Sequence, residues 1–223
     1  MAGVVITIDG PAASGKSTVA RLLALRLGAD FLDTGAMYRA ATLAAMRAGI
    51  DLKNEDELLR IIESSDIQFS TDRGKTVVRL DGADVTDEIR RIDVTANARY
   101  AASAPKVRVR LVEMQRRMAA RKEKIVTEGR DQGTVAFPDA NVKFFLTADA
   151  KTRAQRRRAE MPDADARQDI EQVRRAIEAR DKSDRDREVG PLRPADDAII
   201  LDTTELTIEQ VVRTLLDYVE DRC

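Results

Sequence analysis

The sequence predicts an α/β fold in which a parallel sheet is covered by helices on both faces. Short apolar runs alternate with amphipathic segments, and each run is followed by helical sequence. This alternation is typical of parallel sheets, because the helices that connect successive strands cover both faces. The length of 223 residues fits one domain with an insertion, or one large and one small domain.

The first strand and helix are predicted by a sharp change in pattern near residue 10. Val4–Ile8 is an apolar run that ends at Asp9-Gly10-Pro11, which indicates a buried strand followed by a turn. A helix is expected from about Lys16, because apolar residues recur on one of its faces until Gly28.

Three later runs predict the other strands, and a capped helix closes the pattern. The strands are expected at Ile125-Val126, Val142–Leu146 and Ile199–Leu201. Thr207 and Gln210 have the spacing of a capping box, so the last helix should begin there.

A small antiparallel sheet is predicted as an insertion after a helix at Glu55–Ser65. Between Asp66 and Ile89 the chain has short strand-like runs such as Thr76–Leu80, separated by turn residues that include Asp72-Arg73-Gly74.

The segment Lys151–Arg187 is rich in charged residues and poor in aliphatic ones, so it should be helical and largely solvated. Two interpretations are open: a salt-bridged surface hairpin, or a lid whose few apolar contacts let it open and close easily.

Composition excludes several kinds of chemistry. The absence of His excludes Ser-His-Asp hydrolysis and His-ligated zinc, and a single cysteine, Cys223, excludes an intrachain disulfide or a cysteine metal cluster. The 38 basic and 39 acidic residues argue against extensive nucleic-acid binding. No apolar run is long enough for a membrane span and the first residues lack signal-peptide features, so we expect a cytoplasmic protein.

One loop motif indicates nucleotide binding. Gly10-Pro11-Ala12-Ala13-Ser14-Gly15-Lys16-Ser17 fits G-x-x-x-x-G-K-[ST], the P-loop, between a predicted strand and a predicted helix. Backbone N–H groups of such a loop and the helix N-terminus surround phosphates, and glycines allow the close approach. Lys16 would contact the β- and γ-phosphates, and the Ser17 hydroxyl would ligate Mg²⁺. The motif therefore predicts binding of a nucleoside triphosphate.

The rest of the sequence favours a small kinase over other P-loop proteins. The base-reading Asn-Lys-x-Asp of GTPases does not occur, and Ile125–Glu128 resembles the Walker B strand of motor ATPases only weakly. Arginines follow predicted strands or lie in the charged segment, where they could neutralise two phosphate groups. For each one alone, a solvated surface residue is the better interpretation, and only their joint placement favours a site: Arg39, Arg108, Arg130, Arg180, Arg185 and Arg187.

Four motifs, in order over nearly the whole chain, closely resemble bacterial-type cytidylate kinase. They are Ile6–Thr18, Phe31–Arg39, Glu128–Pro138 and Arg180–Leu192. The first alone would specify only a P-loop, whereas the second and fourth are much more specific. The small sheet at about 66–89 matches an insertion of this family.

The resemblance implies a three-layer P-loop fold with three parts. These are a core of residues 1–33, 101–150 and 188–223, a monophosphate-binding domain of residues 34–100, and a lid of residues 151–187. It also implies transfer of the γ-phosphoryl group of ATP, with Mg²⁺, to CMP or dCMP in pyrimidine nucleotide metabolism. We expect a monomer that binds neither nucleic acid nor a membrane.

Matching positions give the expected site residues. Donor binding would involve residues 10–17 with Thr18, Arg153 and Arg157, and the metal would be bound by Ser17. The catalytic residues would be Lys16, Arg130, Arg157 and Arg187. The acceptor would be bound by Thr34, Tyr38, Arg39, Arg108, Arg130, Asp131, Arg180, Asp184 and Arg187. Among these, Arg108 and Asp131 would recognise cytosine, whereas Arg180 and Asp184 would face the sugar or form an ordinary i,i+4 salt bridge.

Three points stay open at the level of sequence. Arg99 occupies a position where the family commonly has a base-contacting Ser, which leaves one cytosine contact unassigned. Asp33 is either a helix cap or a residue near Mg²⁺ or the acceptor. The alternatives to cytidylate kinase are another small-acceptor kinase (uridylate, adenylate or shikimate kinase) and a nucleotide-binding switch protein.

Overall fold

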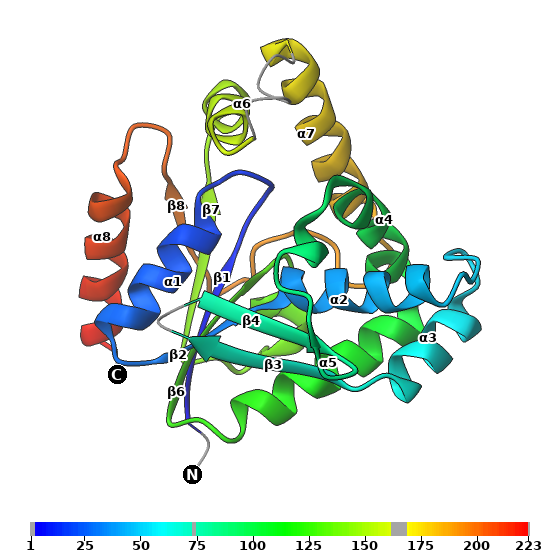
Figure 1. Cartoon of the computed structure of the whole chain (residues 1–223). Coiled ribbons are helices and arrows are strands. Elements are labelled where there is room, and N and C mark those ends of the chain that lie inside the picture. Colours follow the sequence, from blue (N-terminus) through cyan, green and yellow to red (C-terminus); the bar gives the residue numbers. More distant parts are fainter. Residues whose placement is uncertain (1–2, 73–74, 162–168, 223) are drawn as a thin grey trace.

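A five-stranded parallel sheet forms the centre of the computed structural model, which describes residues 3–72, 75–161 and 169–222 (Figure 1). The strand order is β2-β6-β1-β7-β8, and every pairing is parallel. The strands are β1 Val4–Asp9, β2 Asp30–Asp33, β6 Lys124–Gly129, β7 Val142–Thr147 and β8 Ile199–Asp202. The predicted parallel sheet and four of its strands are confirmed.

The edge strand β2 was not predicted. It has only two apolar residues, Phe31 and Leu32, between two aspartates, so no apolar run marks it in the sequence. Its conformation comes from pairing with β6, where Phe31 lies opposite Val126 and Leu32 opposite Thr127.

Helices cover both faces of the sheet, as predicted (Figure 1). On one face, α1 Lys16–Arg26 and α8 Ile208–Glu220 pack on Ile6, Ile8 and Phe144, which all belong to one buried cluster. On the other, α2 Thr34–Arg47 and α5 Pro105–Ala119 contribute to a cluster with Leu32 and Ile125. The capping box of α8 is present, with Thr207 and Gln210 bonded reciprocally.

The predicted insertion is an antiparallel sheet of strands β3 Ile67–Asp72, β4 Lys75–Leu80 and β5 Ala83–Asp84. It follows α3 Glu55–Ser64 and precedes the 3-10 turn η1 Glu88–Arg90 and helix α4 Ile92–Ser103. Val78 and Leu80 of β4 pack against α2. Of the turn predicted at residues 72–74, Arg73 and Gly74 lie outside the described residues.

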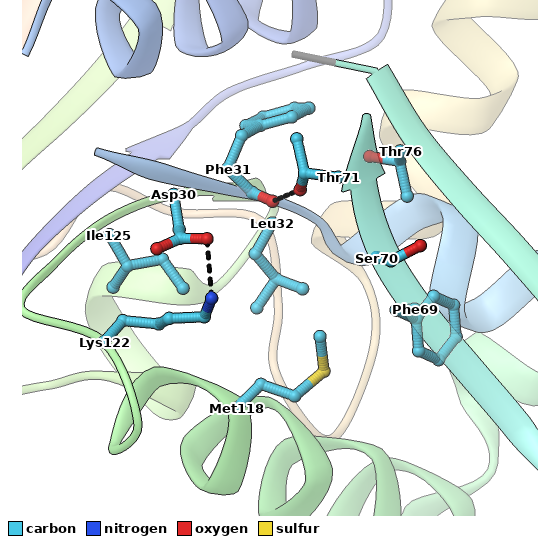
Figure 2. A pocket seen from close by; sticks show the side chains of 10 residues that line it. All are labelled: Asp30, Phe31, Leu32, Phe69, Ser70, Thr71, Thr76, Met118, Lys122 and Ile125. Atoms are coloured by element: carbon cyan, nitrogen blue, oxygen red, sulfur yellow. Dashed lines mark hydrogen bonds and ion pairs between the residues drawn. The ribbon is translucent and has the colours of Figure 1, made fainter. Parts of the chain in front are cut away.

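A pocket lies between this small sheet and the central one, lined by residues of β2, β3 and the end of α5 (Figure 2). Phe31, Leu32 and Met118 line it, and an ion pair of 2.7 Å joins Lys122 to Asp30 at its edge. Asp30 is the first residue of β2, so this edge of the pocket lies at the amino end of that strand.

The charged segment forms two helices, α6 Ala150–Ala159 and α7 Ile170–Arg185, beyond the carboxyl ends of the central strands (Figure 1). Its helical character is confirmed in the part that the structure describes, which leaves out residues 162–168. Ala154 of α6 and Val173 and Ile177 of α7 are buried against Ala12 of the P-loop. In the described part of the chain, none of the helices has both the length and the apolar character that a membrane crossing requires.

Candidate active site

The predicted site residues gather at the carboxyl ends of the central strands, where open parallel sheets bind their ligands. The P-loop follows β1, α2 follows β2, and Arg130 and Asp131 follow β6. Helices α6 and α7 bring the charged segment to the same edge.

The P-loop is shaped by residues with positive φ. Gly10 has φ 152°, and a Cβ there would collide with the carbonyl oxygen of Leu146. Gly15, at φ 86°, is the N-cap of α1, so the first free N–H groups of that helix face the loop. Ala13 also has a positive φ, 58°, although it is not glycine. The backbone is therefore arranged to surround an anion.

Lys16, Ser17 and Glu128 lie together at the start of α1. Lys16 Nζ donates to the carbonyl oxygen of Pro11 at 3.0 Å, and Ser17 Oγ donates to Glu128 Oε1 at 2.8 Å. Burial and the nearby Arg130 lower the pKa of Lys16 to about 7, while burial raises the pKa of Glu128 against the charge of Lys16. Glu128 was not among the predicted site residues, although the sequence places it at the end of a weak Walker B strand.

The start of α2 contributes Asp33, Thr34 and Arg39. Asp33 caps the helix by accepting from the Ala36 N–H at 2.8 Å, and it also binds Arg39 at 3.2 Å. The cap interpretation of Asp33 is therefore confirmed. Thr34 Oγ1 donates to the carbonyl oxygen of Glu128 at 2.7 Å, which fixes α2 to β6.

Arg108 and Asp131 form a buried ion pair beside Tyr38. Arg108 is 2% exposed and its guanidinium carbon lies 5.6 Å from the Tyr38 ring centroid. Gly190 has φ 64° and lies so close that a Cβ there would collide with both charged groups. The interpretation of Arg108 as a solvated surface residue is thus wrong, because its side chain is buried. The ion pair with Asp131 compensates the cost of burying its charge.

Asp184 joins two of the other arginines. It accepts from Arg130 Nε at 2.8 Å and forms an ion pair with Arg187. Burial raises its pKa, but the two arginines outweigh burial and hold the pKa below its usual value. Arg180 is an exposed residue at the edge of this cluster. Partial desolvation of its guanidinium by the surrounding protein, together with the charge of Arg130, lowers its pKa to about 10.

The i,i+4 salt bridge considered for Arg180 and Asp184 is wrong. In the described part of the chain, Asp184 is paired with Arg130 and Arg187 instead. Arg130 lies 54 residues away along the chain, so the tertiary fold sets this partner, whereas Arg187 is a local i,i+3 partner just past the end of α7.

Two arginines of α6, Arg153 and Arg156, lie on the P-loop side. Arg153 is buried, and its guanidinium donates to the carbonyl oxygen of Ala12 at 3.1 Å. Arg156, which was not predicted, donates to Thr203 Oγ1 at 2.9 Å, and Thr203 Oγ1 lies 3.3 Å from the carbonyl oxygen of Ser14. Arg157 is about half exposed and lies 3.7 Å from Glu160.

Arg99 lies on α4 and is exposed. It donates to the Tyr100 hydroxyl at 3.1 Å and stacks 4.9 Å from that ring's centroid. Its contacts within the described residues are to its neighbour in sequence, so the structure assigns it no partner among the predicted acceptor residues.

Asp9, also not predicted as a site residue, fixes the loop that carries Arg130 and Asp131. Its two carboxylate oxygens accept from the backbone N–H groups of Gln132 at 2.9 Å and Gly133 at 2.8 Å. Gln132 and Gly133 begin the π-helical turn η2 Gln132–Ala136. Asp9 therefore joins the end of β1, just before the P-loop, to the segment that follows β6.

Stability should depend on the protonation of Asp9. Burial raises its pKa from 3.8 to about 7, against the two backbone N–H groups that lower it. Between these values the folded state keeps a proton that the unfolded chain has released, so the contribution of Asp9 to stability is present near pH 4 and is lost as the pH rises to 7. The free energy of unfolding of Asp9→Asn should therefore fall less over this range than that of the wild type. The difference between the two proteins should be about 1.4 kcal/mol for each unit by which the fold shifts the pKa of Asp9.

Urea unfolding at pH 4.5 and pH 7 measures this difference. Equal pH dependence in the wild type and in Asp9→Asn would show that Asp9 keeps its ordinary pKa.

Comparisons with known proteins identify relatives of this chain. The cytidylate kinase family model matches residues 6–221. The cytidylate kinase of Mycobacterium avium is 48% identical over 223 residues, covering 99% of this chain and 97% of that protein. The cytidylate kinase of Rhodococcus opacus is 46% identical over 219 residues, covering 98% and 96%. The solved shikimate kinase of Bacteroides thetaiotaomicron has a TM-score of 0.51 at 14% identity, covering 97% of this chain and 98% of that one, which shows a shared fold alone.

Proposed function

Since the chain belongs to the cytidylate kinase family, we propose that it transfers the γ-phosphoryl group of ATP to CMP or dCMP, giving ADP and CDP or dCDP. The observation that carries the proposal is the arginine cluster around Asp184, which lies beside a complete P-loop. Two adjacent anion sites at one sheet edge fit a kinase whose donor and acceptor both carry phosphates.

The acceptor would be held by residues from α2, α5, α7 and the segments after β6 and α7. Arg39, Arg130 and Arg187 would bind its phosphate, because guanidinium groups bind phosphate oxygens bidentately. A buried polar group that hydrogen-bonds one base is left without a partner when a different base binds, and this weakens binding of the second base. Arg108 and Asp131 are such groups and would recognise cytosine, while Arg180 and Asp184 would face the sugar and Thr34 and Tyr38 would complete the pocket.

The donor would be bound by residues 10–18 of the P-loop and α1, with Arg157 near its phosphates. Arg153, also expected near the donor, is buried against the carbonyl oxygen of Ala12 and would support the loop instead. Ser17 Oγ and Glu128 Oε1, 2.8 Å apart, are hard oxygen donors of the kind that Mg²⁺ accepts together with substrate phosphates. The residues present therefore fit Mg²⁺, which would supply charge neutralisation at the transferred phosphate.

The chemistry needs positioning and charge more than proton transfer. The acceptor phosphate is already ionised at neutral pH, so no general base is required, in keeping with the absence of His. Lys16 and the catalytic arginines Arg130, Arg157 and Arg187 would neutralise the charge that develops during transfer. Residues 151–187 would act as the lid that excludes water, which would otherwise hydrolyse ATP.

We also propose the three-part organisation expected from the resemblance. The core comprises residues 1–33, 101–150 and 188–223, and residues 34–100 form the monophosphate-binding domain. Helix α4 continues to Ser103, so the boundary near residue 100 fits best at Ala104, between α4 and α5. A cytoplasmic monomer without nucleic-acid or membrane partners is the form proposed for the enzyme.

A panel of acceptors tests the function. ADP release from ATP should be fastest with CMP and dCMP when CMP, dCMP, UMP, AMP and shikimate are compared. The fastest release with UMP, AMP or shikimate would instead identify another small-acceptor kinase. ADP release that no acceptor stimulates would favour a nucleotide-binding switch.

Asp131→Asn should reduce the preference for CMP over UMP. The carboxylate of Asp131 is buried and paired with Arg108, and an amide cannot replace its charge at the base edge. A lost buried polar match costs about 1–3 kcal/mol, so kcat/KM for CMP should fall by roughly tenfold or more, and that for UMP by less. Asp93→Asn, at an exposed ion pair of α4, is the control. An equal fall for both acceptors would show that Asp131 does not read the base.

A further inference from the structure

Asp181 of α7 contacts the P-loop directly, although it is not among the residues expected to bind substrate. It is 1% exposed. Its Oδ1 accepts from the backbone N–H of Ala12 at 3.0 Å, and its Oδ2 pairs with Arg153 of α6. A buried carboxylate with two such partners is fully engaged in holding them in place.

Arg153 completes the contact from the other helix. Its guanidinium binds the carbonyl oxygen of Ala12 at 3.1 Å, and its Nε donates to the carbonyl oxygen of Ala148 at 3.0 Å. Both backbone polar groups of Ala12 are thus bound by side chains of α6 and α7. The side chain of Ala12 is also buried among Ala154, Val173 and Ile177 of the same helices.

The next residue explains why the loop needs this support. Ala13 has φ 58°, a left-handed conformation that costs free energy for any residue with a Cβ. Ala13 lies between Ala12 and Ser14, two residues before Gly15, the N-cap of α1, so its conformation contributes to the curvature of the phosphate-binding loop. Contacts that fix Ala12 therefore oppose the tendency of Ala13 to leave this conformation.

We propose that Asp181 and Arg153 are positioning residues that hold the P-loop in its phosphate-binding shape and tie it to α6 and α7. ATP affinity would then depend on two side chains that act through the backbone of Ala12. When only a fraction of molecules has the competent loop, the apparent Kd rises by the inverse of that fraction. The inference rests on the proposed function only in taking ATP as the donor.

Asp181→Asn tests the contact. The variant keeps an oxygen for the Ala12 N–H, but it loses the charge and places an amide N–H against Arg153. The Kd for ATP, measured by isothermal titration calorimetry without acceptor, should rise about tenfold, and KM for ATP with it. KM for CMP should stay within about twofold. Arg174→Gln is the control, because it removes exposed ion pairs of the same helix and should change neither constant.

Ala13→Gly distinguishes an effect through the loop from a general loss of stability. Glycine adopts a positive φ without a steric penalty. In the Asp181→Asn background, Ala13→Gly should therefore lower the Kd for ATP by at least about threefold, and in the wild type it should change that Kd by less than about twofold. An equal effect in both backgrounds, or unchanged ATP affinity in Asp181→Asn, would overturn the proposal.

If Asp181→Asn does not fold, the double variant Asp181→Asn with Arg153→Met removes both charges and leaves no buried charge unpaired. It should show the same weaker ATP binding and the same rescue by Ala13→Gly, and wild-type affinity would overturn the proposal. A wild type that binds ATP but does not phosphorylate CMP would refute the proposed function without affecting this test.

Discussion

Replacing Lys16 by alanine should lower kcat for CMP phosphorylation by roughly 10²- to 10³-fold or more while the protein stays folded. Lys16 is 5% exposed, with its ammonium group held inside the P-loop by the carbonyl oxygen of Pro11. In this position the cation can neutralise charge that grows on the phosphates in the transition state. Its loss therefore affects the chemical step more than substrate binding.

The coupled assay for ADP release, with saturating ATP and CMP, measures this loss. Thermal unfolding shows whether the variant is folded, and Lys53→Ala, at an exposed lysine before α3, is the matched control. A folded Lys16→Ala protein with near-wild-type turnover would reject the P-loop assignment.

Asp184→Ala should lower kcat/KM for both acceptors by roughly 10²-fold and should also change the ratio of CMP to dCMP activity. The carboxylate holds Arg130 and Arg187, so its removal leaves both guanidinium groups free to move out of position. If Asp184 also accepts from a ribose hydroxyl, only CMP loses that bond at the 2′ position.

Three outcomes are distinguishable for Asp184→Ala. Lower activity with a changed ratio supports contact with the sugar, and an equal fall for CMP and dCMP assigns the residue to positioning the arginines alone. Unchanged activity would contradict any role in the site. Glu178→Ala, on the exposed side of α7, should leave both acceptors unaffected.

The elements that could be predicted from the sequence are those set by local pattern. The apolar runs at β1, β7 and β8, the P-loop between β1 and α1, and the capping box of α8 all depend on residues close together in the chain. The small antiparallel sheet was also predictable, because its turns and alternating residues are adjacent.

Features that depend on distant residues could not be predicted. Strand β2 is too short to have a pattern of its own, and it is formed by pairing with β6. Asp181 meets Ala12 across 169 residues, and Asp9 meets Gln132 across 123. Arg108 resembles a surface residue in the sequence, because nothing nearby reveals that Asp131 compensates its charge in the interior.

Identification of the products formed from ATP, Mg²⁺ and CMP tests the central claim most directly. ³¹P NMR of the wild-type reaction separates CDP, ADP and inorganic phosphate in one spectrum. Phosphoryl transfer predicts that CDP and ADP appear in equal amounts with negligible inorganic phosphate. ADP accompanied by inorganic phosphate, with CMP unchanged, would show hydrolysis in place of transfer and would contradict the account.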